Sequence, residues 1–297
     1  MGLKIVSKIL EIRNLVRESR LKLKKIGLVP TMGALHPGHG KLIQEARQEC
    51  DEVIVSIFVN PTQFGPNEDF ERYPRTLAED IELAQKAGAT MIFHPSVDEI
   101  YPEIQKTWVT VDQLGDFLCG SSRPGHFRGV TTIVTKLFGI VQPDYAYFGA
   151  KDIQQARIIE QLTTDLNIAI EIKIIATVRE NDGLAMSSRN RYLSPDDRAK
   201  ASKIYQSILE VESLVEAGEL RSDVLRETLT TRLKSIEGFK IDYVEVVDYH
   251  TLQPQRIIKQ KTIVAVAIFL GGTRLIDNIV IDPIPSNSSL PSTWEGE

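Results

Sequence analysis

IGLVPTMGALHPGHGKL, residues 26–42, is the stretch that decides the fold of this chain. Its start predicts a short buried strand at 26–29, followed by a turn rich in Gly and Pro and by the first turn of a helix. A helix that begins here leaves backbone N–H groups unpaired, and such groups favour a phosphate. His36 and His39 lie at this junction, where imidazoles can donate hydrogen bonds to charge developing on phosphorus. The stretch therefore predicts a site for a nucleotide α-phosphate.

Alternating strands and helices are predicted on both sides of this stretch. Helical periodicity covers residues 5–20, and a second helix is expected over 41–50. The apolar run 53–59 is typical of a strand buried on both faces of a parallel sheet. The same alternation continues with helices at 76–87, 130–141 and 153–167 and strands at 90–93, 145–148 and 170–176. Residues 101–129 are rich in Gly and Pro and predict loops with short strands. These β-α-β units predict an α/β fold with a doubly wound parallel sheet.

The pattern changes near residue 190. A helix that opens at Ser194 and Pro195, and a longer one over 222–236, precede three strand-like runs at 241–247, 262–269 and 274–281. We therefore predict a first domain over 1–190 and a smaller α+β domain over 191–282. The Pro- and Ser-rich residues 283–297 predict a disordered tail or linker.

Composition and charge limit the classes of function. The 297 residues carry a net charge of −5, which gives no support for binding to nucleic acid or to an anionic membrane. Cys50 and Cys119 are far apart and lack metal-ligand spacing, so neither a disulfide framework nor a structural zinc site is expected. No apolar run approaches the roughly 20 residues of a membrane span, and no signal-peptide pattern precedes Leu28. We expect a soluble cytoplasmic protein.

Polar side chains gather directly after four of the predicted strands. Ligands of a doubly wound sheet bind where its parallel strands end, so we expect these side chains to meet in one site. In chain order they are Thr31, His36 and His39; Asn60 and Gln63; Lys151, Asp152 and Gln155; and Arg179, Ser187, Ser188 and Arg189. The position of Lys151 favours contact with phosphate. Gln63 and Gln155 could be surface amides, whereas a buried amide in either place can hydrogen-bond a hydroxy acid.

Each of these features also has a simpler explanation. His36 and His39 could cap a helix or lie on the surface, and Lys151 could be an ordinary surface lysine. Residues 187–189 could form a turn in which short hydroxyls bond nearby backbone. A zinc site would need further Cys, His or acidic ligands at suitable spacing, and none is obvious. The convergence of four strand ends is therefore stronger support than any single motif.

Several common motifs are absent, and two remaining ones point to a superfamily. The chain has no phosphate loop of the G-x-x-x-x-G-K-[ST] type, no G-x-G-x-x-G and no G-x-S-x-G. What remains is His-Pro-Gly-His at residues 36–39 and Met-Ser-Ser-Arg at residues 186–189. This pair resembles the nucleotidyltransferase superfamily that includes class I aminoacyl-tRNA synthetases. There, the first element contacts the nucleotide and its α-phosphate, and the second holds the departing pyrophosphate.

Six sequence blocks narrow this resemblance to one family. They are PTMGALHPGH at 30–39, FVNPTQF at 58–64, YPRT at 73–76, RPGHF at 123–127, FGAKD with QQ at 148–155, and GLAMSSRNR at 183–191. In this order, and with TRLIDN at 273–278, they resemble the pantoate–β-alanine ligase family. The resemblance implies a Rossmann-like N-terminal domain, a smaller C-terminal lid domain and a homodimer. It also implies an ATP-dependent condensation of pantoate with β-alanine through pantoyl adenylate, which releases pyrophosphate and AMP.

The resemblance further implies a role for each matching residue. His36, His39 and Lys151 are the expected catalytic residues. The residues expected to bind ATP are Met32, Gly33, His36, Gly38, His39, Gly149, Lys151, Asp152, Val178, Met186, Ser187, Ser188 and Arg189. Those expected to bind pantoate or β-alanine are Gln63, Gln155, Asn60 and Met32. Asp80 is expected to help hold Mg²⁺, the implied cofactor. Some members of the family are fused to a cytidylate kinase, and residues 283–297 would suit such a linker.

Three other functions fit part of this pattern. An adenylyl- or cytidylyltransferase would keep the nucleotide on its product. A nucleotide-sensing module would bind ATP without turnover, although the number of polar strand ends disfavours it. A fragment of a tRNA synthetase is disfavoured by the acidic balance and by the lack of an anticodon-binding region.

Overall fold

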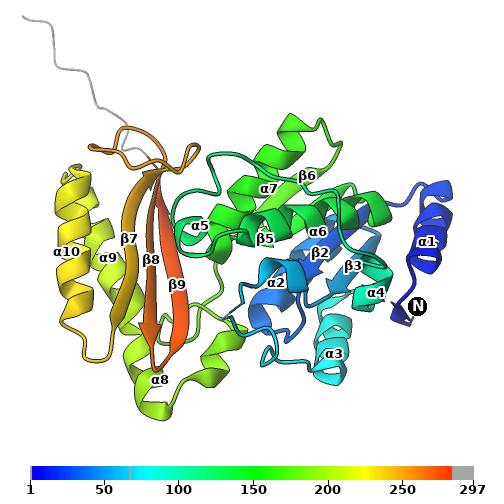
Figure 1. Cartoon of the computed structure of the whole chain (residues 1–297), viewed down its shortest axis with the longest axis horizontal. Coiled ribbons are helices and arrows are strands. Elements are labelled where there is room, and N and C mark those ends of the chain that lie inside the picture. The colour runs from blue at the N-terminus through cyan, green and yellow to red at the C-terminus, as the bar shows by residue number, and fades with distance from the viewer. Residues whose placement is uncertain (1, 67, 283–297) are drawn as a thin grey trace, which may run out of the picture.

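A six-stranded parallel sheet forms the N-terminal part of the computed structural model, which describes residues 2–66 and 68–282 (Figure 1). Its strands are β1 (Lys4–Val6), β2 (Ile26–Thr31), β3 (Glu52–Ile57), β4 (Met91–Phe93), β5 (Tyr145–Gly149) and β6 (Glu171–Ile175). Their order is β1-β4-β3-β2-β5-β6, and every neighbouring pair is parallel. From β2 the chain adds β3 and β4 on one side and then β5 and β6 on the other. The predicted doubly wound α/β fold is therefore confirmed.

Helices cover both faces of this sheet. They are α1 (Ile9–Leu21), α2 (Pro37–Glu49), α3 (Leu77–Ala87), α4 (Val97–Ile100), α5 (Cys119–Ser122), α6 (His126–Val141) and α7 (Ile153–Asp165). In β3, Ile54 packs into a cluster with α1, α6 and α7, whereas Val53 and Val55 pack into a second cluster with α2 and α3. Successive strand residues face opposite sides of a sheet, so both sides of β3 must be apolar.

The first element of the chain differs from its prediction. Residues 5–20 were expected to form one helix, but β1 occupies Lys4–Val6 and pairs with β4, and α1 begins only at Ile9. Val6 is buried, as are Ile12 and Val16 of α1. A three-residue strand is too short to show a period of two, and its apolar residues therefore extended the helical pattern that follows.

Two helices that frame the site begin earlier than predicted. The helix expected over 41–50 starts at Pro37, so the His-Pro-Gly-His sequence already forms its cap and first turn. The helix expected from residue 130 starts at His126. In α6, a Cβ on Gly129 would lie 2.3 Å from the carbonyl oxygen of Thr62, which only glycine avoids. This contact brings α6 against the short turn η1 (Pro61–Gln63).

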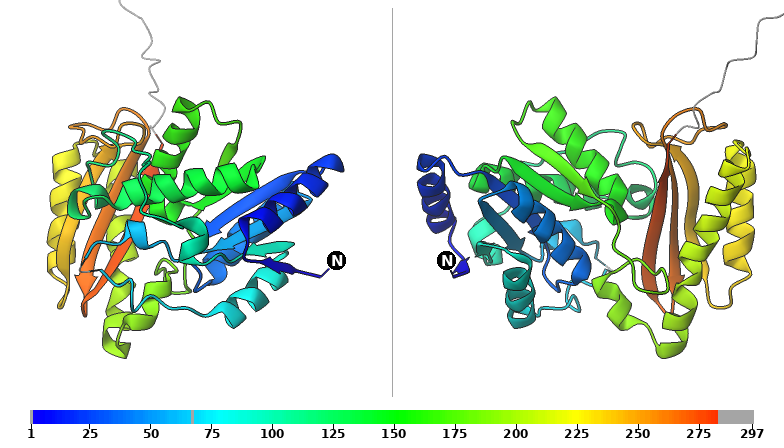
Figure 2. Two further views of the ribbon diagram at one scale, coloured as in Figure 1. Left: turned by 45° about the vertical axis from the view of Figure 1, so that its right-hand side comes forward. Right: turned by 180° about the vertical axis from the view of Figure 1, so that it is seen from behind.

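A three-stranded antiparallel sheet forms the C-terminal part (Figure 2). Its strands are β7 (Lys240–Asp248), β8 (Thr262–Leu270) and β9 (Thr273–Ile281), and the helices of this part are α8 (Pro195–Ala201), α9 (Lys203–Glu216) and α10 (Ser222–Lys234). One face packs on α9 and α10, with Val264 and Val266 at its centre. On the other face, Ile263 and Ala265 share a cluster with residues of α5, α6 and α7. The second sheet is therefore buried on both sides, and one side is supplied by the first part of the chain.

The structure bears only partly on two further predictions, the domain boundary near residue 190 and the C-terminal tail. The boundary expected at residue 190 falls inside the turn η3 (Ser188–Tyr192), between β6 and α8. The tail or linker expected over 283–297 lies outside the described residues. Across residues 2–66 and 68–282, no helix is long and apolar enough to cross a membrane.

Candidate active site

The turn between β2 and α2 places both histidines at the start of a helix. His36 is the N-cap residue of α2, and its Nδ1 accepts a hydrogen bond from the backbone N–H of Gly38 at 3.2 Å. The Nδ1 of His39 accepts one from the backbone N–H of His36 at 3.3 Å. This reciprocal arrangement is a capping box in which two imidazoles replace the usual Ser or Thr and Glu. The two ring centroids lie 4.1 Å apart.

These contacts determine the protonation of both imidazoles. Because each Nδ1 accepts a backbone N–H, the proton of each neutral ring is on Nε2. Burial, with smaller contributions from His39, Lys151 and Arg191, lowers the pKa of His36 to about 2. Burial also lowers the pKa of His39 to about 4, although Asp152 opposes this change. Near pH 7 each side chain is therefore neutral and has one Nε2–H left to donate.

Asp80, the residue expected to help hold Mg²⁺, lies beneath this turn instead. Its carboxylate is 1% exposed and accepts hydrogen bonds from the backbone N–H of Ala34 at 3.0 Å and of Leu35 at 2.7 Å. The hydroxyl of Thr76 donates a third, at 3.1 Å. This pairing holds Ala34 at a φ of 50°, which residues with a Cβ rarely adopt. Asp80 therefore fixes the turn that leads to His36, and its contact with Mg²⁺ stays a prediction.

A cavity of about 220 Å³ lies at the carboxyl end of the parallel sheet. The predicted binding residues that line it are Met32, His36, Gly38, His39, Asn60, Gln63, Gly149, Lys151, Asp152, Gln155, Val178, Met186, Ser187, Ser188 and Arg189. Gly33 is not among the lining residues. It has a φ of 80°, and a Cβ there would lie 3.0 Å from both Asp80 and Ile57. The four predicted strand ends therefore do meet, and Gly33 serves the turn rather than the cavity wall.

The amide side chains in this cavity differ in whether they already make hydrogen bonds to other described residues. The amide nitrogen of Asn60 donates to Gln63 Oε1 at 3.1 Å and to the carbonyl of Gly129 at 3.2 Å, and its oxygen accepts from Tyr101 at 2.9 Å. Asn60 is 1% exposed, so it orients Gln63 and has no group left for a ligand. Gln155 makes no side-chain hydrogen bond within the part of the chain that the structure describes, and it lines the cavity.

Lys151 lies on the short turn η2 (Ala150–Asp152), which follows β5. Its Nζ is 3.9 Å from Asp152 Oδ2, beyond hydrogen-bond distance, and its side chain is 20% exposed. The backbone of the turn is held from the C-terminal sheet, because the amide of Asn278 on β9 donates to the carbonyls of Ala150 and Lys151. The ammonium group is therefore placed at the cavity without a close partner among residues 2–66 and 68–282.

The predicted Ser-Ser-Arg element forms the opposite wall. Ser187 caps η3 and accepts a hydrogen bond from the backbone N–H of Arg189. Ser188 is buried, and its hydroxyl lies 3.3 Å from that of Tyr73. The guanidinium of Arg189 makes two hydrogen bonds of 2.9 Å to the carboxylate of Asp69. Asp69 thus occupies the fork formed by Nε and Nη2, and Nη1 makes no hydrogen bond among the described residues.

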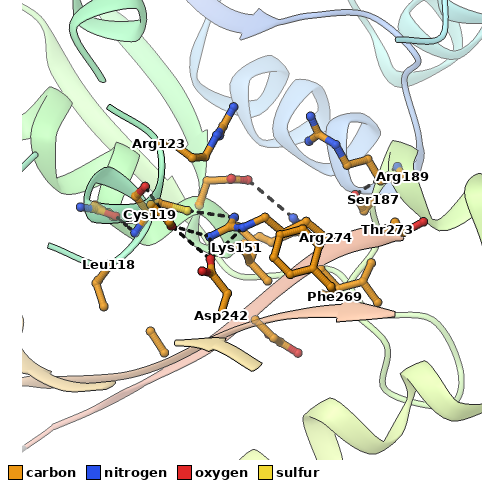
Figure 3. Close-up of a pocket in the computed structure, with 18 of the residues that line it drawn as sticks. Leu118, Cys119, Arg123, Lys151, Ser187, Arg189, Asp242, Phe269, Thr273 and Arg274 are labelled. Atoms are coloured by element: carbon orange, nitrogen blue, oxygen red, sulfur yellow. Dashed lines mark hydrogen bonds and ion pairs between the residues drawn. The ribbon is translucent and has the colours of Figure 1, made fainter. Parts of the chain in front are cut away.

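A second cavity, of about 430 Å³, lies between the two sheets (Figure 3). Lys151, Ser187 and Arg189 reach it from the N-terminal side, whereas Asp242, Phe269, Thr273 and Arg274 belong to the C-terminal sheet. The residues that line both cavities are Lys151, Asp152, Gln155, Ser187 and Arg189. The two cavities are therefore adjacent, and we refer to them together as the cleft.

Several residues of the cleft had no role in the sequence prediction. Arg123 binds Glu68 through two side-chain hydrogen bonds, and its Nη1 lies 3.1 Å from Nε2 of His126. Glu68 and Asp69 belong to the segment 64–76, whose sequence shows neither periodicity nor a motif for them. Each pairs with an arginine more than fifty residues away, so no local pattern could identify the pair.

No group of three His, Cys, Asp or Glu side chains suited to a metal occurs among the described residues. Of the acidic residues in the cleft, Asp69 is paired with Arg189, and Asp152 has a side chain that is 53% exposed. Mg²⁺ is usually held by one or two carboxylates together with substrate phosphates. One or two carboxylates of the described residues could still hold an ion together with phosphate oxygens of a ligand.

Comparison with known proteins identifies the family. A model described as pantoate-beta-alanine ligase matches residues 4–280. Over 279 residues, the chain is 52% identical to the pantothenate synthetase of Thermotoga petrophila, with 94% of this chain and 100% of that protein covered. It is 51% identical over 280 residues to that of Moorella thermoacetica, with coverage of 94% and 99%.

Solved structures agree with this comparison. Pantothenate synthetase from Thermus thermophilus superimposes with a TM-score of 0.88 at 41% identity, over 93% of this chain and 98% of that one. A pantoate-beta-alanine ligase from Francisella tularensis, complexed with beta-gamma ATP and beta-alanine, superimposes with a TM-score of 0.77 at 37% identity, over 94% and 98%. The resemblance found in the six sequence blocks is therefore confirmed, and this chain belongs to the pantoate–β-alanine ligase family.

Proposed function

We propose that the protein joins pantoate to β-alanine with ATP, through a pantoyl-adenylate intermediate. The observation that carries this proposal is the meeting of two kinds of group in one cavity. Neutral imidazole donors and the cations Lys151 and Arg189 suit a nucleotide phosphate, and the amides of Gln63 and Gln155 suit a hydroxy acid. The family membership of the chain supports the same reaction.

In the first half-reaction, a carboxylate oxygen of pantoate attacks the α-phosphorus of ATP. A P–O bond forms to pantoate, the bond to the β-phosphate oxygen breaks, and pyrophosphate leaves with the electron pair. Such a transfer needs positioning and charge stabilisation more than covalent help from the protein. We assign stabilisation of the developing charge to Nε2–H of His36 and His39, to Lys151 and to Arg189.

In the second half-reaction, the amine of β-alanine attacks the activated acyl carbon. A C–N bond forms, the bond from the acyl carbon to the phosphate oxygen breaks, and AMP leaves while the nitrogen loses a proton to solvent. A free carboxylate does not react in this way because its oxide is a poor leaving group. AMP is a far better one, so the adenylate makes amide formation possible.

Recognition of pantoate is assigned to Gln63 and Gln155. The Nε2 of Gln63 lies 2.9 Å from the sulfur of Met32, a weak acceptor that a substrate oxygen could replace. Asn60 is assigned a positioning role, because its amide already holds Oε1 of Gln63. This changes its expected role from a contact of the amine substrate to a support for the pantoate site.

The remaining assignments follow from the family rather than from the geometry. We propose that ATP enters as its Mg²⁺ complex, so that the ion is part of the substrate. We also propose a catalytic domain over 1–190, a lid domain over 191–282, a homodimer and a cytoplasmic location. The segment 64–76 and the C-terminal domain would together shield the adenylate from water.

One assay tests the reaction against its nearest alternative. The protein is incubated with ATP and labelled pyrophosphate, with and without pantoate, and label in ATP and release of AMP are measured. We expect exchange only with pantoate and AMP release only after β-alanine is added. A nucleotidyltransferase that keeps the nucleotide on its product would release no AMP, and an ATP-binding module would show no exchange.

A further inference from the structure

A residue of the second domain holds the turn that carries Lys151. Asn278 on β9 is 6% exposed, and its Nδ2 donates to the carbonyl of Ala150 at 3.0 Å and to that of Lys151 at 2.9 Å. Both N–H groups of the amide are thus used on consecutive carbonyls of η2. Among the described hydrogen bonds, these join the C-terminal sheet directly to the backbone of a predicted catalytic residue.

Asn278 is itself fixed by a buried ion pair. The preceding residue, Asp277, is 2% exposed and accepts two hydrogen bonds from Arg179, at 2.7 and 2.9 Å. Oδ1 of Asp277 also accepts the backbone N–H of Asn278 at 2.8 Å. The guanidinium of Arg179 lies 3.5 Å from the ring centroid of Tyr205, which restrains it further. The amide of Asn278 therefore has little freedom to move away from η2.

The side chain of Lys151 lacks comparable support of its own. The carboxylate nearest to its Nζ is Asp152 at 3.9 Å, and no hydrogen bond from Nζ occurs in the described structure. The direction in which the ammonium points then depends on the backbone of η2. Asn278 holds that backbone through hydrogen bonds to two of its carbonyls. Loss of these bonds would therefore allow the Cα of Lys151 to shift.

We propose that Asn278 is a positioning residue for adenylation, which acts from the C-terminal domain by setting the place of Lys151. The proposal rests on the assigned role of Lys151 at the phosphates. If Asn278 has this role, the C-terminal sheet must be docked on η2 before Lys151 can stabilise the triphosphate. This would be a second task of the C-terminal domain, besides shielding the adenylate from water. Misplacing a catalytic group by about 1 Å typically lowers a rate by about a hundredfold.

A double-mutant cycle separates positioning from simple attachment of the two domains. Asn278→Ala, Lys151→Ala and the double variant are compared by pantoate-dependent exchange of pyrophosphate into ATP, with KM for ATP and thermal unfolding measured in parallel. We expect Asn278→Ala to lower the maximal exchange rate by about ten- to a hundredfold. In the Lys151→Ala background, the same change should alter the rate by less than about twofold.

Arg274→Gln is the matched control. Arg274 is on the same strand and contacts Cys119 across the domain interface at 3.2 Å, and none of its described hydrogen bonds goes to η2. Its loss should change the rate by the same factor in both backgrounds. If Asn278→Ala also acts equally in both, Asn278 only fastens the domains and the proposal is wrong.

A second variant and a labelling experiment test the proposal independently of the alanine variant. Asn278→Asp preserves the shape of the side chain and removes the N–H donors, so it replaces the alanine variant if that variant does not fold. Labelling of Lys151 by acetic anhydride, followed by mass spectrometry, should lose its protection by ATP in either Asn278 variant. Retained protection would overturn the proposal. A Lys151→Ala variant with normal exchange would instead refute the assigned role of Lys151, and the role of Asn278 with it.

Discussion

Gln154 and Gln155 are consecutive residues of α7 whose amides serve different parts of the molecule. Oε1 of Gln154 accepts the backbone N–H of Cys119 at 2.9 Å, and its Nε2 donates to the carbonyls of Leu114 and Phe117 at 2.9 and 2.7 Å. Gln155 lines both cavities of the cleft. Neighbouring residues of a helix point about 100° apart, so the amide of Gln154 secures the loop before α6 while Gln155 lines both cavities.

We expect Gln155→Ala to raise KM for pantoate by about tenfold, the loss of roughly one hydrogen bond, with little change in thermal stability. Gln154→Ala should instead lower the free energy of unfolding by about 1–3 kcal/mol, because it leaves buried backbone groups unpaired. Exchange kinetics at varied pantoate, together with denaturant unfolding, would measure both. An unchanged pantoate KM in Gln155→Ala would remove this residue from the binding site.

His39→Ala and Lys151→Ala should each lower the exchange rate at least about a hundredfold, because one preorganised donor to such a transition state is worth about 2.7–4 kcal/mol. The fold should persist in both variants, as checked by circular dichroism. His94→Ala is the control, since the imidazole of His94 contacts the carbonyl of Ile57 and lines neither cavity. Near-normal rates in His39→Ala and Lys151→Ala would exclude both residues from catalysis.

Between pH 5 and 8, the two site histidines should not titrate. Burial lowers the pKa of His36 to about 2 and that of His39 to about 4, so both stay neutral throughout this range. The pantoate-dependent exchange rate should therefore show no inflection near pH 6.5, the ordinary value for histidine. An inflection there that disappears in His39→Gln would show that His39 acts as a protonated acid.

The same pKa shifts affect stability in a predictable direction. In the unfolded chain these histidines bind protons near pH 6.5, whereas in the folded protein they do so only at lower pH. The unfolded state therefore binds more protons between about pH 4 and 6.5, and stability is lost as pH falls through this window. Denaturant unfolding from pH 4 to 7 should show a smaller loss in His39→Ala than in the parent protein.

Asp80→Asn should destabilise the protein by about 1.5–3 kcal/mol, because charged hydrogen bonds to the backbone of Ala34 and Leu35 are lost or reversed. The displaced turn should also weaken ATP binding. Because we assign Asp80 to the turn, the Mg²⁺ concentration that gives half-maximal exchange should stay the same. A strong increase in that concentration would instead support the predicted contact of Asp80 with Mg²⁺.

The sequence allowed the central sheet and most of the site to be predicted, for a physical reason. Apolar runs mark buried parallel strands, and ligands bind where such strands end, so His36, Gln63, Lys151 and Arg189 could be grouped before any coordinates were known. β1 was missed because a three-residue strand has too few residues to show its period.

The contacts that complete the site were beyond prediction. Asp69 with Arg189 and Asn278 with Lys151 are pairs more than a hundred residues apart, and only the tertiary fold brings the members of each pair together. The family resemblance implied a metal role for Asp80 but could not show that its place in the first turn of α3 directs it at two backbone amides. Sequence patterns can indicate which side chains are polar, but not which partner satisfies them.

The wall shared by the two cavities has a consequence for inhibitor design. Lys151, Asp152, Gln155, Ser187 and Arg189 border both spaces, so a single compound that passes these side chains could contact residues of both. Joining an acyl-sulfamate mimic to a group that fills the larger space would place the second fragment at high effective concentration. Such a compound would lose translational and rotational freedom once, whereas two separate fragments each lose it. It should therefore have a lower Kd than either fragment alone.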